Sequence, residues 1–220
     1  MNRLAHTPAE IPSEIAALRV VPVLELGSVE DAFPLVEALC RGGLPIAEIT
    51  LRSEAGREAI PRLRQAYPDV LIGAGTVRSA EDVRWVVDAG AAFVVSPATN
   101  PELIEFCRAL RIPVLPGACT PTEVDAAVRA GAEVVKFFPA EAMGGVAFLK
   151  ALAGPFRDVS FVPTGGIGPG NLAEYLRLPQ VLACGGSWMV APRLLAERRF
   201  DLVEQLAREA IEIASEVYVG

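Results

Sequence analysis

The sequence predicts an α/β protein whose parallel strands and helices form a closed (β/α)₈ barrel. Short runs of β-branched, apolar residues alternate with amphipathic segments along the 220-residue chain. The runs are apolar on both faces, which is typical of parallel strands that helices cover. Eight such units, spaced about 20 to 27 residues apart, pack most simply as a barrel. An open doubly wound sheet is the alternative.

Eight segments fit the strands of this barrel. They are residues 20–24, 46–51, 70–72, 93–95, 113–115, 134–138, 161–162 and 181–183. Apolar residues recur at helical spacing between them, in residues 29–40, 53–66, 80–89, 101–110, 121–130 and 146–152. The residues expected to cap these helices are Ser28, Ser79 and Thr120 at their starts and Gly42, Gly90 and Gly131 at their ends.

The two ends of the chain complete the barrel. Residues 12–18 are expected to form an extra helix that closes the bottom, and residues 200–218 a final helix packed on the outside. No linker, low-complexity stretch or run of charge divides the chain. We therefore expect one domain over residues 1–220, in which residues 1–19 are the N-terminal segment and capping helix.

Composition argues against several classes of protein. The chain has 27 acidic and 20 basic residues, so it offers no basic surface for nucleic acid. No apolar run approaches the roughly 18 residues that a membrane span needs. Residues 1–19 carry charges where a signal peptide would be apolar. We expect a soluble, cytoplasmic protein with no nucleic-acid or membrane partner.

The sequence also has few residues suited to metal binding or to cysteine chemistry. His6 is the sole histidine, which argues against catalytic triads and histidine-built zinc sites. The four cysteines are scattered without a Cys-x-x-Cys pair, as expected for reduced thiols. We therefore expect no metal and no cofactor. The chain has two lysines, Lys136 and Lys150, so chemistry that requires a lysine has two candidates.

Barrels of this kind place their chemistry at the carboxyl ends of the strands. Lys136 interrupts an apolar run there and shares a strand face with Val134 and Phe138. If this face points into the barrel, desolvation favours the neutral amine, a nucleophile able to form a Schiff base with a carbonyl. A structural ion pair, or a side chain reaching the rim, explains the spacing equally well. Lys150 lies on an amphipathic helix and is expected at the surface.

Glu48 is a second polar residue inside an apolar run. It shares a strand face with Thr50 and Arg52, near the carboxyl end of the strand. A partly buried glutamate can move protons, and an arginine can bind a substrate carboxylate through two hydrogen bonds. An ion pair between Glu48 and Arg52 with no chemical role is at least as good an explanation of this spacing.

Glycine-rich turns follow the last two strands, where barrels often bind phosphate. Gly165 and Gly166 lie in one turn, and Ser187 follows a second Gly-Gly pair. Glycine lets backbone amides approach phosphate oxygens, and the serine hydroxyl adds a donor. The turn before Thr76 also combines close backbone access with a hydroxyl. Together these features describe a class I aldolase acting on a phosphorylated 2-keto acid, for which no metal is required.

Six strings resemble the 2-keto-3-deoxy-6-phosphogluconate (KDPG) aldolase family, also called 4-hydroxy-2-oxoglutarate (KHG) aldolase. They are EITLR at 48–52, GAGTV at 73–77, VKFFPAE at 135–141, AGPF at 153–156, PTGGI at 163–167 and GGSW at 185–188. They occur in the family's order, and the similarity extends from about residue 20 to the C-terminus. The resemblance implies a (β/α)₈ barrel, usually a homotrimer, that cleaves KDPG to pyruvate and glyceraldehyde 3-phosphate in the Entner–Doudoroff pathway.

The resemblance also implies a role for each site residue. Lys136 would form the Schiff base, and Glu48 would act as the general acid and base. Arg52 and Thr76 would bind the substrate carboxylate. Pro97, Phe138 and Thr164 would line the pocket. Gly165, Gly166 and Ser187 would bind the phosphate.

Departures from the family pattern concern substrate choice. Glu25 stands where many relatives have a neutral or basic residue, and an acidic group there is expected to weaken binding of an anionic substrate. Alternative substrates are KHG and 2-keto-3-deoxy-6-phosphogalactonate. A phosphate-binding barrel without turnover and a phosphosugar isomerase or epimerase are further alternatives, although the isomerase would not need a buried lysine.

Overall fold

The structure is a computed structural model that describes residues 7–217, so His6 and Tyr218 lie outside the described residues. Its strands are short, and those that hydrogen-bond to each other run parallel. They are β1 (Val20–Leu24), β2 (Ile46–Thr50), β3 (Leu71–Gly75), β4 (Val94–Val95), β5 (Val114–Leu115), β6 (Gly117–Ala118), β7 (Val134–Phe137), β8 (Ser160–Pro163) and β9 (Cys184–Gly186).

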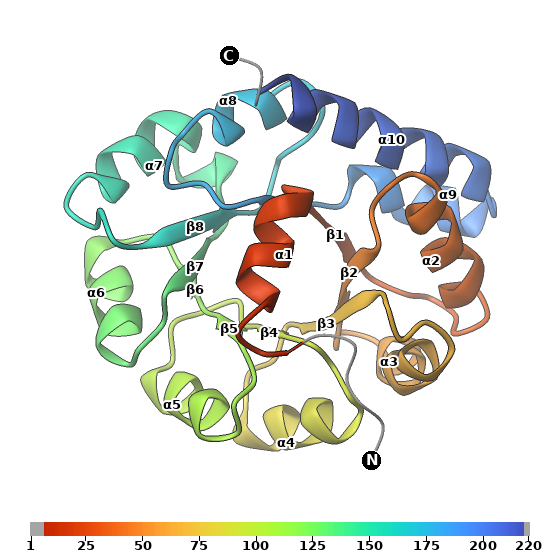
Figure 1. The fold of residues 1–220 in the computed structure, drawn as a ribbon, viewed down its shortest axis with the longest axis horizontal. Coiled ribbons are helices and arrows are strands. Elements are labelled where there is room, and N and C mark those ends of the chain that lie inside the picture. The colour runs from red at the N-terminus through yellow and green to blue at the C-terminus, as the bar shows by residue number, and fades with distance from the viewer. Residues whose placement is uncertain (1–6, 218–220) are drawn as a thin grey trace.

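These strands close into the predicted barrel (Figure 1). One sheet has the order β5-β4-β3-β2-β1-β9, and the other has the order β6-β7-β8. Strands β5 and β6 are successive pieces of one strand position, separated by Pro116. Two single bridges, Phe161 to Val181 and Thr164 to Gly185, join β8 to the segment that contains β9. Within residues 7–217, the nine strands therefore fill the eight positions of a closed parallel barrel.

Helices surround the barrel (Figure 1). The outer helices are α2 (Ala32–Arg41), α3 (Glu54–Ala66), α4 (Ala80–Asp88), α5 (Pro101–Ala109), α6 (Pro121–Arg129), α7 (Gly145–Ala153), α8 (Leu172–Leu176), α9 (Pro192–Ala196) and α10 (Phe200–Glu216), with short 3₁₀ turns η1 (Glu141–Met143) and η2 (Trp188–Val190). The sequence did not predict α8 and α9, because five residues are too few to establish a helical period. None of the helices described is long and apolar enough to cross a membrane.

Two of the three predicted N-caps are confirmed, and one is wrong. The Ser79 side chain accepts a hydrogen bond from the amide of Asp82, and Thr120 forms a capping box with Glu123. Helix α2 begins at Ala32 rather than directly after Ser28. The Ser28 hydroxyl oxygen instead accepts a hydrogen bond from the nearby Glu30 amide at 3.2 Å, a local turn that precedes the helix.

The eighth strand position also differs from the prediction. Residues 181–183 were expected to be the strand because of their apolar character, but β9 is Cys184–Gly186. It pairs with Val20, Val21 and Pro22 of β1, whereas Val181 makes a single bridge to β8. Pairing with the first strand closes the ring, and this long-range requirement overrides the low strand propensity of glycine.

Helix α1 (Ile11–Leu18) lies across the end of the barrel where the strands begin, as expected (Figure 1). It leads through Arg19 directly into β1. Its apolar side points into the barrel, because Ile11 and Ile15 are 2% and 1% exposed. The bottom of the barrel is therefore sealed by α1, and the opposite end is free to hold a site.

We predict that Ile15→Ala lowers the free energy of unfolding by about 2–5 kcal/mol, because it empties a buried space beneath the strands. Urea denaturation would measure this loss. Ser13→Ala, on the exposed side of the same helix, is the matched control and should change stability by less than about 0.5 kcal/mol. Equal stabilities for the two variants would show that α1 does not seal the barrel.

Candidate active site

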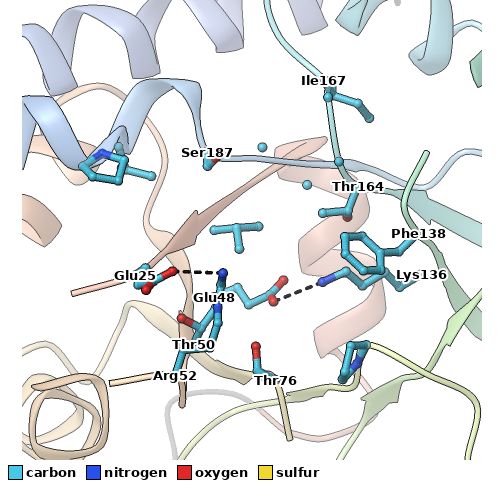
Figure 2. Close-up of a pocket in the computed structure, with 18 residues that line it drawn as sticks. Glu25, Glu48, Thr50, Arg52, Thr76, Lys136, Phe138, Thr164, Ile167 and Ser187 are labelled. Carbon is cyan, nitrogen blue, oxygen red and sulfur yellow. Dashed lines mark hydrogen bonds and ion pairs between the residues drawn. The ribbon is translucent and has the colours of Figure 1, made fainter. Parts of the chain in front are cut away.

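A cavity of about 380 Å³ lies at the carboxyl ends of the strands, opposite α1 (Figure 2). Every residue that the sequence predicts for the site lines it, namely Glu48, Arg52, Thr76, Pro97, Lys136, Phe138, Thr164, Gly165, Gly166 and Ser187. The wall also contains Val23, Ile167, Val190 and Pro192, which sequence reasoning missed. An apolar residue in or just after a strand has the same sequence pattern whether it lines a pocket or packs in the core, so the sequence could not identify these four.

Lys136 and Glu48 form a buried ion pair in this cavity (Figure 2). Lys136 Nζ lies 3.3 Å from Glu48 Oε1, and the two side chains are 8% and 5% exposed. The amine also lies 5.2 Å from the centroid of the Phe138 ring, within range of a cation–π interaction. The face of β7 that carries Lys136 therefore points into the barrel, and the ion pair considered from the sequence is also present. Because Lys136 lines the cavity wall, a ligand in the cavity can reach its amine.

Glu48 fits inside the barrel because the neighbouring strand carries glycine. In the β2–β3 register, Glu48 lies beside Gly73 and Thr50 beside Gly75. A Cβ atom on Gly75 would lie 2.3 Å from Glu48 Oε1, which is much closer than a Cβ atom approaches a non-bonded oxygen. The Thr50 hydroxyl donates a hydrogen bond of 2.9 Å to the carbonyl of Leu24, which ties the ends of β1 and β2 together.

Arg52 and Glu25 form a second ion pair, at the mouth of the cavity (Figure 2). Arg52 Nη1 lies 2.9 Å from Glu25 Oε2, and the side chains are 50% and 51% exposed. The pair joins the segments that follow β1 and β2. The Glu48–Arg52 ion pair considered from the sequence is therefore replaced by two others, Glu48 with Lys136 and Arg52 with Glu25.

Thr76 reaches the cavity through an unusual backbone conformation, and Pro97 through close packing against a glycine. Thr76 has a φ of 61°, a left-handed conformation that a β-branched residue rarely adopts and that costs about 1–2 kcal/mol. It directly follows β3, so the end of this strand imposes the conformation. Pro97 lies against β6, where a Cβ atom on Gly117 would be 2.3 Å from the Pro97 carbonyl oxygen.

The turn after β8 packs tightly on the segment after β7. Gly165 and Gly166 have φ angles of 104° and 80°, which favour glycine. The carbonyls of Thr164 and Gly165 accept hydrogen bonds from the amides of Ala140 and Glu141, at 2.8 and 3.0 Å. A Cβ atom on Gly166 would lie 2.7 Å from Glu141 Cβ. The turn is therefore held rigidly at the rim.

The second Gly-Gly pair differs from the expectation. Gly185 and Gly186 lie in strand β9 rather than in a turn. Glycine is required at 185 because a Cβ atom there would lie 2.3 Å from Thr164 Oγ1. Ser187 is the first residue after β9 and is exposed at the cavity rim. In the segment that was predicted to be a phosphate-binding turn, the two glycines belong to the strand and only Ser187 lies after it.

The described residues offer little support for a metal site or for a reactive cysteine. Among residues 7–217, no group of three or more His, Cys, Asp or Glu side chains is placed to hold a metal ion. Burial raises the pKa of the Cys107 thiol to about 12 and also raises that of Cys184, which disfavours reactive thiolates. Lys150 is exposed on α7, as predicted.

A closed (β/α)₈ barrel with a buried lysine and glutamate open to its cavity defines the class of enzyme as a class I aldolase barrel. Residues 11–206 match the family model for KDPG and KHG aldolase. The chain is 44% identical over 210 residues to 2-dehydro-3-deoxy-phosphogluconate aldolase of Haemophilus influenzae, covering 96% of this chain and 99% of the relative. The chain therefore belongs to the KDPG and KHG aldolase family. It is an enzyme, a carbon–carbon lyase.

Solved structures agree with this assignment. KDPG aldolase from Legionella pneumophila, with pyruvate captured as a covalent carbinolamine intermediate, superposes with a TM-score of 0.87 at 40% identity. That comparison covers 90% of this chain and 97% of the other. The Zymomonas mobilis aldolase with 3-phosphoglycerate also has a TM-score of 0.87, at 36% identity over 93% of this chain and 96% of the other.

We predict that Gly166→Ala lowers the free energy of unfolding by about 1–3 kcal/mol, because the new methyl group meets Glu141 and the backbone is left-handed. Gly168→Ala is the matched control, since a Cβ atom there has no neighbour within 4 Å. Thermal unfolding of both variants measures the difference. Equal melting temperatures would contradict the tight packing of this turn.

Proposed function

We propose that this chain is a Schiff-base aldolase that cleaves KDPG to pyruvate and glyceraldehyde 3-phosphate, a reaction of the Entner–Doudoroff pathway. The observation that carries the proposal is the Lys136 amine, buried in the cavity 3.3 Å from the Glu48 carboxylate. A shielded amine beside a carboxylate that can take and return protons suits imine chemistry. Capture of pyruvate as a carbinolamine in the Legionella relative supports the same chemistry here.

The proposed reaction begins when Lys136 Nζ gives a proton to the Glu48 carboxylate and the free amine attacks the C2 carbonyl of the keto acid. Glu48 relays the protons that convert the carbinolamine into a protonated imine and water. When the C3–C4 bond breaks, its electron pair moves into the iminium and leaves an enamine. Glu48 takes the proton of the C4 hydroxyl, so that the aldehyde leaves. Protonation at C3 and hydrolysis of the imine release pyruvate and free the amine.

The rest of the cavity would position the substrate around this pair. Arg52 and Thr76, at the ends of β2 and β3, would bind the carboxylate. The proposed pocket wall is Pro97, Phe138 and Thr164, and the proposed phosphate site is Gly165, Gly166 and Ser187. This division suits a molecule with an anionic group at each end, since Lys136 lies between the two sites (Figure 2).

The second candidate substrate is KHG, which carries a carboxylate where KDPG carries its phosphate end. The family model that the chain matches covers both substrates. The galactonate epimer of KDPG is a further variant of the same proposal. Comparing kcat/KM for phosphorylated and unphosphorylated substrates would separate KDPG from KHG, because loss of the phosphate contacts would reduce kcat/KM for KHG. Comparing the two phosphorylated epimers would separate KDPG from the galactonate.

We also propose that the enzyme is a homotrimer, acts in the cytoplasm and requires no metal or cofactor. The trimer follows from the usual state of the family that the sequence resembles. The absence of a cofactor requirement follows from the chemistry, because the imine itself accepts the electrons released on cleavage. The single domain over residues 1–220 stays a prediction from the sequence.

We predict that pyruvate and borohydride give a reduced covalent adduct on Lys136, and that Lys136→Ala abolishes both adduct and turnover. Intact mass followed by peptide mapping locates the adduct. Lys150→Ala is the matched control, because it removes the other lysine from an exposed position on α7. An adduct on Lys150 alone, or none, would refute the Schiff-base assignment.

We predict that Glu48→Gln still forms some adduct but lowers kcat by roughly 10²–10⁴-fold, as loss of a proton-transfer group does. The amide keeps the size of the side chain in its buried position while removing its ability to accept a proton. Steady-state kinetics and borohydride trapping should be measured on the same preparation. Unimpaired turnover would remove Glu48 from the mechanism.

A further inference from the structure

The charged groups that line the cavity are paired with each other. Among the described lining residues, the charged side chains are Glu25, Glu48, Arg52 and Lys136. They form two ion pairs, with contacts of 3.3 and 2.9 Å. Their charges therefore balance, although the substrates proposed above are anionic. A keto acid that binds through the Arg52 guanidinium has to compete with a carboxylate of the protein.

The backbone places that carboxylate beside Arg52. Strand alternation turns Val23 and Glu25 toward the cavity and turns Leu24 into the surrounding core. The Thr50 hydroxyl donates to the Leu24 carbonyl, so the chain on either side of Glu25 and Arg52 is held together. The contact is therefore a consequence of β1–β2 pairing rather than of two long side chains meeting by chance.

The two ion pairs differ in how easily they exchange partners. The side chains of Lys136 and Glu48 are 8% and 5% exposed, whereas those of Arg52 and Glu25 are 50% and 51% exposed. A pair that is half in water is worth little, because solvent and salt screen it. The Glu25 carboxylate can turn into solvent at small cost, which leaves the guanidinium to another carboxylate.

We propose that Glu25 is a positioning residue that sets the affinity of the site for keto acids: it holds Arg52 in the free enzyme and is displaced by the carboxylate of the keto acid. This inference rests on the proposed function and deepens it. Glu25 weakens the binding of keto acids and speeds the release of pyruvate, because Arg52 has an internal partner to return to. It acts through Arg52 and does not touch the reacting carbons.

The test measures how the yield of borohydride-trapped adduct depends on pyruvate concentration. Glu25→Gln should lower the half-saturating pyruvate concentration about two- to fivefold, the range expected for a half-exposed ion pair. High salt should shrink the difference, because screening weakens the Glu25–Arg52 pair in the wild type. The yield at saturating pyruvate should stay unchanged, which shows that the site is intact.

Two controls make the result specific. Glu204→Gln breaks partly exposed pairs with Arg41 and Arg208 on the outer helices and should leave the half-saturating concentration unchanged. In an Arg52→Gln background, Glu25→Gln should have a smaller effect than in the wild type. An equal effect there would show repulsion through space and would overturn the role through Arg52. An unchanged or higher half-saturating concentration for Glu25→Gln alone would also overturn it. No adduct in the wild type would instead reject the proposed function.

Discussion

Placing the Lys136 ammonium and the Glu48 carboxylate together inside the barrel is the constraint on which the rest of the site depends. A charge that is taken out of water is costly unless a partner is near, and removing one member of a buried pair typically costs about 3–5 kcal/mol. The two residues are 88 positions apart and come from β7 and β2. They meet only if the ring of strands closes, so the pair links the active centre to the completion of the fold.

Glycine is what lets the strand ends carry this chemistry. The interior of a small barrel has little free volume, and each polar group needs space that a neighbouring residue gives up. Gly75 makes room for Glu48, Gly185 for Thr164, and Gly117 for the backbone of Pro97. The GAGT and GGSW strings are therefore required by packing as well as by any contact with a ligand. Similarity in such strings therefore indicates that two proteins share the geometry of the site. It does not by itself identify the substrate.

The two ion pairs of the cavity differ in burial. The enclosed Lys136–Glu48 pair is shielded from water, which suits a reaction that depends on the state of one proton. The half-exposed Glu25–Arg52 pair lies at the mouth of the cavity. In the proposed mechanism, the chemistry takes place at the floor of the cavity, and Glu25 sets the affinity for keto acids at its mouth.

The sequence by itself determined the barrel, most helix limits and the side chains that face the cavity. The barrel and its helices follow from local periodicity, and Lys136 and Glu48 stand out as charged residues within apolar runs. Other cavity residues, such as Pro97 and Thr164, were predicted from the resemblance to the family. The tertiary structure alone decided which acid pairs with which base, the position of β9 and the left-handed conformation of Thr76. Strand spacing allowed Glu48 to pair with Arg52, four residues away, yet each found its partner on another segment. These pairings depend on contacts between strands that are far apart in the sequence. A local sequence pattern carries no information about such contacts.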